Sequence, residues 1–213
     1  MSALDQLVPA PRLVEVDCVD VAAAPAAAWE RVRRGDLGGS RLVRALFGLR
    51  ALPARLRGEP AAEPAVRLDD LVSTPDRPGF RILAEVPPHE VAVGAVGRVW
   101  ERVIPFVDLS GADAFAAFAE PGYVKVAWAI RVDPLGPTGS RIAFEVRVGA
   151  TDEGAWRRFR RYFRVIGPGS RLIRRSALSG LARDLGALGA DEDRKSTRLN
   201  SSHPQLSRMP SSA

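Results

Sequence analysis

The stretch "RIAFEVRVGATDEGAWRRFRRYF", residues 141–163, decides the fold because its hydrophobic period changes partway along. Residues 141–150 alternate between apolar and polar side chains, which predicts a half-buried β-strand. After "TDE" the apolar residues recur at helical spacing, and Thr151 or Asp152 is placed to cap that helix. A strand therefore leads directly into an amphipathic helix. The apolar face of the strand consists of Ile142, Phe144, Val146 and Val148.

This last helix has two chemically different faces. Trp156, Phe159, Phe163 and Ile166 form one stripe, and Arg157, Arg160, Arg161 and Arg164 fall opposite. Burying each large apolar side chain is worth about 1.5–3 kcal/mol. We therefore expect the aromatic stripe to pack on the sheet and the arginines to face water. The sequence "GPGS" at 167–170 is expected to interrupt the helix, with Ser170 capping a second segment.

Residues 123–132 predict the strand that pairs with residues 141–150. The turn sequence "DPLGPTGS" joins the two, which predicts an antiparallel hairpin with one wet and one dry face. The dry face of the first strand consists of Val124, Val126, Trp128, Ile130 and Val132.

The N-terminal part begins with a strand and a helix. Residues 12–21 alternate, with Val14, Val16 and Cys18 on one face and Glu15 and Asp17 on the other, which predicts a half-buried strand. The helix that follows begins near Pro25, turns Trp29 and Val32 inward, and ends at Gly35.

The middle of the chain is expected to contain helices, a loop and further strands. A second helix is expected over 41–52 and a proline-rich loop over 57–79. A strand is expected over 80–86, one long strand or two shorter ones over 89–106, and a short helix over 110–122. This order is typical of an α+β domain, in which one curved antiparallel sheet is covered by the long C-terminal helix.

The ends of the chain differ from its body. Residues 1–10 are expected to be flexible and 11–190 to form the domain. Residues 191–213 are expected to be a disordered tail, because 194–213 is serine-rich and resembles translated sequencing-adapter DNA. The tail 194–213 carries four of the 31 basic residues and none of the 25 acidic ones, which lowers the formal net charge from +6 to +2. The high isoelectric point is therefore weak evidence for a nucleic-acid partner.

Composition narrows the class of protein further. Cys18 is the single cysteine, so no disulfide framework is expected and the compartment is expected to be reducing. No signal peptide and no apolar run of about 18 residues is found, so a cytoplasmic protein without a transmembrane segment is expected. The oligomeric state stays open.

The order of elements resembles the START-like superfamily, also called SRPBCC or Bet v 1-like, with its helix-grip fold. The resemblance lies in "VDVAAAPAAAWERVRRGDL", "FRILAEVPPHEVAVGAVGRVW" and "RIAFEVRVGATDEGAWRRFRRYF", and it covers residues 11–186. The extra helix near 111–120 and the "GPGS" sequence depart from the family pattern. The resemblance implies an apolar cavity between the sheet and the last helix, which in such proteins holds lipids, polyketides or other hydrophobic small molecules.

The apolar faces of the predicted strands and of the last helix predict which residues would line such a cavity. We expect no cofactor and no metal, because one histidine and one cysteine in the domain form no ligand cluster. The expected ligand-binding residues are Trp100, Val126, Trp128, Phe144, Val146, Phe159, Tyr162 and Phe163.

Catalytic motifs are absent from the sequence. No nucleophile elbow, phosphate loop or dinucleotide fingerprint occurs. Glu101, Tyr123 and His89 are the candidates for proton transfer, although His89 beside Pro87-Pro88 is expected at the surface.

Three functions follow from these observations. The first is binding of a hydrophobic small molecule, lipid-like or polyketide-like, by apolar enclosure. The second is a polyketide cyclase or dehydratase on the same fold. The third is an interaction module in which the outer arginines bind an anionic partner, for which nucleic acid is not expected because the aromatic residues lie opposite the arginines.

Overall fold

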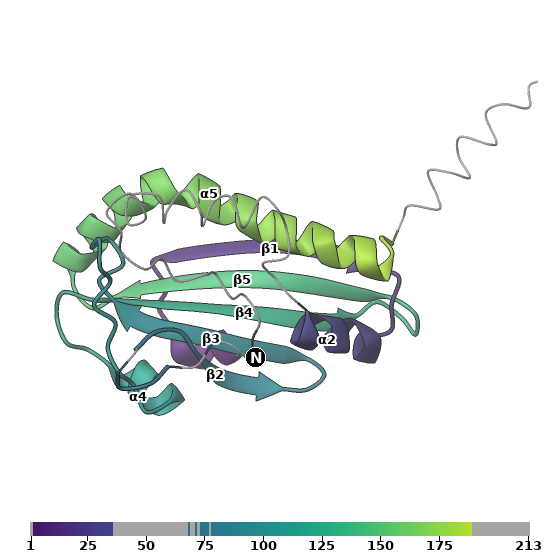
Figure 1. The fold of residues 1–213 in the computed structure, drawn as a ribbon, viewed down its shortest axis with the longest axis horizontal. Helices are drawn as coiled ribbons and strands as arrows, with labels where there is room; N and C mark the ends of the chain where they lie inside the picture. The colour runs from purple at the N-terminus through teal and green to yellow at the C-terminus, as the bar shows by residue number, and fades with distance from the viewer. Residues whose placement is uncertain (1, 36–67, 69–70, 72, 77, 189–213) are drawn as a thin grey trace, which may run out of the picture.

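The computed structural model describes residues 2–35, 68, 71, 73–76 and 78–188, and shows an α+β fold (Figure 1). Five antiparallel strands form one curved sheet in the order β1-β5-β4-β3-β2. The long helix α5 arches across one face of this sheet. The fold class expected from the sequence is thus confirmed. The elements are α1 (Ala3–Leu7), β1 (Leu13–Val21), α2 (Pro25–Arg34), β2 (Arg81–Val86), β3 (Glu90–Gly97), α4 (Ala112–Ala117), β4 (Val124–Pro134), β5 (Ser140–Ala150) and α5 (Glu153–Leu185).

The predicted hairpin is the centre of the sheet. β4 and β5 pair along their full lengths, with Trp128 opposite Val146 and Ile130 opposite Phe144. Both apolar faces therefore point to the same side, which is the side of α5. The turn between the strands contains Gly136 at φ 86°, a backbone conformation that glycine adopts without steric cost.

Helix α5 packs as the sequence predicted. Asp152 caps its first turn, where the carboxylate accepts a hydrogen bond from the Ala155 N–H at 2.8 Å. Phe159 is buried, and Trp156 and Phe163 are half-buried against the sheet. The arginines expected outside, Arg157, Arg160, Arg161 and Arg164, are all exposed. The aromatic stripe is covered and the guanidinium groups face water, as hydrophobic burial requires.

The predicted interruption of this helix is wrong. Helix α5 runs continuously from Glu153 to Leu185 and contains Pro168, and Ser170 caps no second segment. A proline inside a helix removes one backbone hydrogen bond and favours a bend. The bend fits the arch that Figure 1 shows, so α5 follows the curved sheet. Burial of Gly167, Leu178 and Leu181 on either side of the proline favours one helix over two.

The opposite face of the sheet is covered by helices from two distant parts of the chain. Helices α1 and α4 bury Leu4, Leu7 and Phe115 against β3 and β4. Residues 1–10 were expected to be flexible, whereas Ala3–Leu7 form a helix. A capping box between Ser2 and Asp5 starts it, and two buried leucines hold it on the sheet.

Polar contacts also join α1 to the sheet. The Ser2 hydroxyl donates to Glu90 at 2.5 Å, and the Ala3 N–H donates to the same carboxylate at 2.9 Å. Arg147 and Asp5 form an ion pair at 2.8 Å.

Strand β1 alternates as predicted, but its acidic face is the one that points toward α5. Val14, Val16 and Cys18 are exposed, whereas Glu15 and Asp17 are half-buried under the helix. The register explains this orientation, because Glu15 lies opposite Val146 and Asp17 opposite Phe144, which both face α5.

Other predicted elements are shorter than expected or lie outside the described residues. The strand expected over 89–106 ends at Gly97, and α4 occupies only part of 110–122. The helix expected over 41–52, most of the loop over 57–79 and the tail 191–213 lie outside the described residues.

Candidate functional site

The two faces of the sheet differ in how completely they are covered. On the outer face Ala92, Ala127 and Ala129 are fully or almost fully buried under α1 and α4. On the concave face, which points toward α5, four side chains of β4 and β5 are only half-buried, whereas Ile130 and Ile142 are fully buried. Protein interiors are normally close-packed, so this partial exposure is informative. The half-buried residues are Val126, Trp128, Phe144 and Val146.

Aromatic rings are concentrated on this concave face. Trp128 and Phe144 stack with ring centroids 5.2 Å apart and an interplanar angle of 25°. On the helix, Phe159 stacks on Phe163 at 5.3 Å and on Trp156 at 5.8 Å. Offset-stacked rings at such distances present rigid, apolar surfaces. The face can therefore offer flat apolar area from the sheet and from the helix.

The eight residues predicted to bind a ligand all lie in the apolar clusters of this face. Trp128 and Phe144 pack beside the cluster that contains Leu178 of α5. The other six lie together near the start of α5, in a cluster that also contains Trp156. These six are Trp100, Val126, Val146, Phe159, Tyr162 and Phe163.

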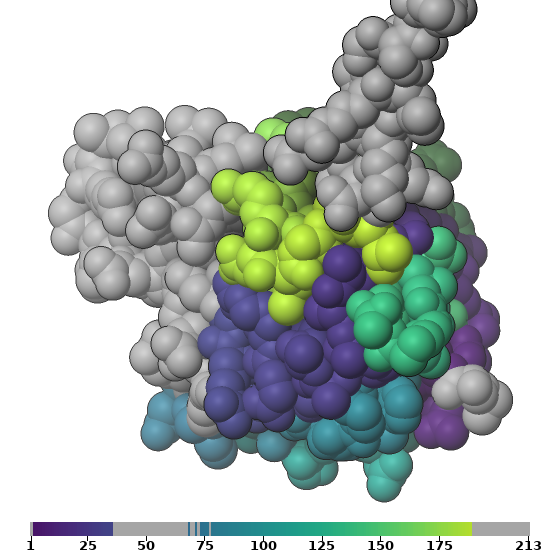
Figure 2. All heavy atoms as spheres, turned by 90° about the vertical axis from the view of Figure 1, so that its right-hand side faces the viewer, coloured from purple at the N-terminus to yellow at the C-terminus, as the bar shows by residue number. Residues whose placement is uncertain are grey.

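One end of the concave face is closed. Trp29 and Val32 of α2 pack into the same cluster as Leu181 of α5. Arg31 donates from Nε to Asp184 at 3.0 Å across the same junction. Figure 2 views this end and shows α2 and the C-terminal part of α5 in direct contact. Access to the aromatic surface at this end is therefore blocked by α2.

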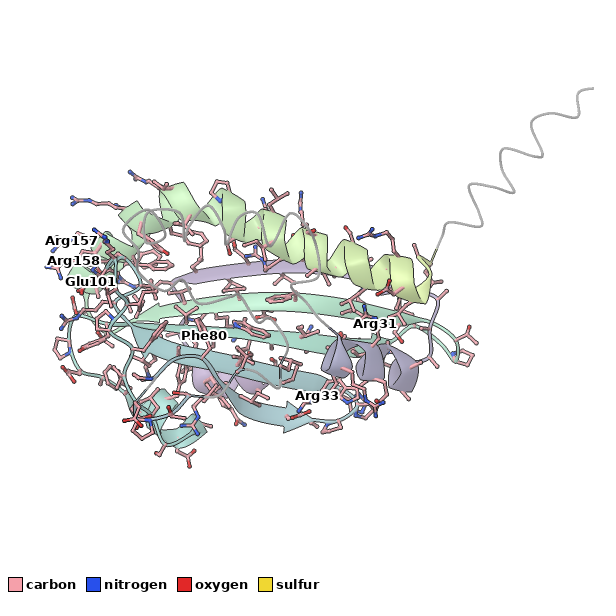
Figure 3. The ribbon with its side chains drawn as sticks, viewed as in Figure 1. Arg31, Arg33, Phe80, Glu101, Arg157 and Arg158 are labelled. Carbon is pink, nitrogen blue, oxygen red and sulfur yellow. The ribbon has the colours of Figure 1, made fainter. Side chains whose placement is uncertain are left out.

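The three candidate catalytic residues are not brought together. Glu101 is exposed, its carboxylate lies 3.8 Å from Arg98, and it is at the same end of the molecule as Arg157 and Arg158 in Figure 3. Tyr123 lies with the outer-face cluster, where its ring meets Phe118 edge-on at 5.4 Å. His89 is exposed in the turn between β2 and β3, as the sequence predicted. Each of the three therefore stays a separate candidate for proton transfer.

A charged cluster lies under α5 that sequence reasoning missed. Arg174 donates from Nη2 to Glu15 at 2.6 Å and from Nε to Asp17 at 3.0 Å, and its Nη1 donates to the Ser170 hydroxyl at 3.1 Å. Arg175 adds a bond to Asp17 at 3.2 Å. Every nitrogen of the Arg174 guanidinium is thus bonded, so the cluster is suited to holding the helix on β1 rather than to proton transfer.

A sequence pattern existed that could have revealed this cluster. Arg174, Leu178 and Leu181 follow at helical spacing, so the arginine shares the buried stripe of α5. Glu15 and Asp17 lie two residues apart and therefore on one side of a strand. A cation on an apolar stripe and two carboxylates on one strand face together predict a buried ion pair.

The described residues contain neither a metal-ligand cluster nor a membrane-spanning helix. Among them, no three histidine, cysteine, aspartate or glutamate side chains cluster as metal ligands would. Within the same residues, no helix combines the length and the apolar character needed to cross a bilayer.

Comparisons with known proteins give likenesses of shape only. No protein-family model matches the chain, and no curated protein matches its sequence. Among the described residues, the strand order and the long helix across the concave face define an α+β architecture with one curved antiparallel sheet. This is the architecture that was expected from the sequence.

Three solved structures show a distant likeness in shape to this chain. Norcoclaurine synthase from Thalictrum flavum, as a point mutant, is 14% identical with a TM-score of 0.36, over 81% of this chain and 94% of that one. The Zhui aromatase/cyclase from Streptomyces sp. R1128 is 16% identical with a TM-score of 0.29, over 83% and 98%. A conserved protein from Geobacillus kaustophilus is 9% identical with a TM-score of 0.38, over 81% and 95%.

Proposed function

We propose that this protein binds a hydrophobic small molecule, lipid-like or polyketide-like, on the concave face between the sheet and α5. The supporting observation is the partial exposure of Val126, Trp128, Phe144 and Val146 on the face that carries the aromatic rings. Covering such surface stabilises a complex by roughly 25 cal/mol for each Å² removed from water.

The polar groups on this face fit binding by apolar enclosure. Glu15 and Asp17 are both bonded to Arg174 within the protein. A ligand that carries a charge would lose water without gaining a free partner in this cluster. The proposed ligand is therefore neutral over the part that contacts the sheet. We do not extend the proposal to cyclisation or dehydration, because Glu101 and His89 are exposed and Tyr123 packs against the cluster of the outer face.

Uptake of a neutral hydrophobic dye tests the proposal. We expect Nile red to gain fluorescence with the wild-type chain, and we expect Trp128→Ala and Phe144→Ala to weaken its binding. Val86→Thr is the matched control, since Val86 is an exposed apolar residue on β2 outside the clusters of the concave face. Native mass spectrometry of the protein after mild purification should also detect a co-purified apolar compound.

The result that would overturn the proposal is equally specific. If the Trp128 and Phe144 variants stay folded by circular dichroism and bind Nile red as the wild type does, the concave face is not the binding surface. An equal loss of Nile red binding in Val86→Thr would show that the dye binds exposed apolar surface in general.

A further inference from the structure

Within the part of the chain that the structure describes, one edge of strand β1 is only partly paired. β5 pairs with one side of it, and the residues after α5 begin to pair with the other. The Ala22 N–H donates to the Gly186 carbonyl at 2.7 Å, and the Leu188 N–H donates to the Asp20 carbonyl at 3.1 Å. Backbone direction alternates along a strand, so the N–H and C=O groups of residues 14, 16 and 18 point to the same free edge. Within the described residues, no backbone bond to that edge is found before Asp20.

The side chains at this edge are apolar and accessible. Val14 is 49% exposed, Val16 is 51% exposed, and Cys18 is also exposed. Natural proteins usually protect an edge strand with charges, prolines or a covering element, because an open edge templates further pairing. An edge that combines free backbone groups with apolar side chains is suited to accept another strand.

A surface pocket lies directly beside this edge. It has a volume of about 400 Å³ and is lined by residues 16–19 of β1 and by Arg175, Leu178 and Ser179 of α5. Leu178 is buried, whereas the Arg175 side chain is 63% exposed. The pocket therefore has an apolar wall and one accessible positive charge. A side chain from an added strand would enter it wherever that strand points toward α5.

We propose that the β1 edge binds an extended peptide segment of a partner protein, which adds to the sheet as an antiparallel strand. The antiparallel direction continues the pairing that Val21 and Ala187 already make. Residues opposite Val14, Val16 and Cys18 lie on the outer face and are aliphatic. The residue opposite Asp17 points toward the pocket and is acidic, because Arg175 is the exposed charge there and Asp17 is already paired.

A second copy of the chain fits this edge less well. Two β1 strands related by a two-fold axis would put both α5 helices over the same face of the joined sheet. An exposed Arg175 would then stand on each side of the seam, and like charges at close range disfavour the contact. An acidic peptide avoids this repulsion between arginines, and the charge of Asp17 opposite it is already balanced by Arg174 and Arg175.

A random dodecapeptide display library, selected on the immobilised full chain, tests the proposal. We expect enriched sequences to alternate aliphatic residues with an acidic residue. A fluorescent copy of the best peptide is then titrated against the wild type and variants. Val16→Pro removes an outward N–H and should weaken binding about tenfold, whereas Val16→Thr keeps that N–H and should stay within about threefold.

Two further sets of variants test the role of the Arg175 charge and of the backbone hydrogen bonds separately. Arg175→Glu should weaken binding about fivefold, and the exposed Arg171→Glu one turn earlier should change it less than about twofold. A peptide N-methylated at its pairing positions should lose binding to the wild type, even if Val16→Pro fails to fold. Enriched peptides without alternation, or undiminished binding by folded Val16→Pro or by the N-methylated peptide, would overturn the proposal. A dimer in light scattering that Val16→Pro dissociates would instead assign the edge to a second copy.

Discussion

The guanidinium of Arg174 on α5 donates to the carboxylate of Glu15 on β1 at 2.6 Å, and the Arg174 side chain is only 4% exposed. The two residues are far apart in the chain, and their bond joins the last helix to the first strand of the sheet. Removing one member of a buried ion pair leaves an uncompensated charge, which is more costly than losing the whole pair. The stability of the α5–β1 contact should therefore depend strongly on this bond.

Arg174→Ala is expected to lower the free energy of unfolding by about 3–5 kcal/mol. The reason is that Glu15 and Asp17 would stay partly buried without their main cation. Urea denaturation followed by circular dichroism measures the change. Arg175→Ala is the matched control and should cost no more than about 1 kcal/mol, since that side chain is largely exposed. Equal costs in the two variants would contradict a burial-based explanation.

The N-terminal helix should contribute to stability. Leu4 is fully buried against the outer face of the sheet. Leu4→Ala is therefore expected to lower the free energy of unfolding by about 2–5 kcal/mol. Leu135→Ala, in the exposed turn after β4, should stay within about 0.5 kcal/mol. Thermal and urea unfolding of both variants compares them. If Leu4→Ala leaves the free energy of unfolding unchanged, residues 1–10 do not contribute to stability, as expected of a flexible segment.

Stability should depend on pH through the cap of α5. Hydrogen bonds from the backbone N–H groups of Ala155 and Gly122 lower the pKa of Asp152 below its ordinary value of 3.8. A lowered pKa in the folded state means that the unfolded state binds the proton more tightly. The contribution of Asp152 is therefore fully present above pH 3.8 and is lost as the pH falls through the lower, folded pKa.

Asp152→Asn tests this prediction because the amide oxygen can still accept a hydrogen bond but carries no charge. We expect the variant to be less stable than the wild type at neutral pH, with the difference shrinking as the pH falls below 3.8. Urea midpoints measured from pH 7 to pH 2 give the comparison. A difference that is independent of pH would assign the effect to geometry alone.

The outer arginines of α5 should contribute little to stability. Arg157 and Arg158 are exposed, so replacing both with glutamine is expected to change the free energy of unfolding by less than about 0.5 kcal/mol each. The hypothesis that these arginines bind an anionic partner is tested by measuring retention on heparin at increasing salt concentration. A steep salt dependence that disappears in the double variant would favour that hypothesis over a solvated outer face.

The orientation of β1 could not be predicted from its sequence pattern, which does not show which of its two faces points toward α5. Alternation placed Val14 and Val16 on one face and Glu15 and Asp17 on the other, and that division is correct. Hydrophobicity alone would put the valines inside. The pairing register with β5 puts the carboxylates under α5 instead, because Arg174 supplies the charge that lets them be buried.

The sequence by itself determined the β4–β5 hairpin, a helix that begins at Thr151 or Asp152, and the aromatic stripe of α5, since each depends on neighbours within a few residues. Local periodicity records which side chains share a face, and it therefore identified the apolar faces of β4, β5 and α5 that pack together. Only the tertiary structure decided the continuity of α5 through Pro168, the packing of Ala3–Leu7, and the separation of Glu101, Tyr123 and His89. Those outcomes depend on burial and charge pairing between segments distant in the chain, which no local pattern encodes.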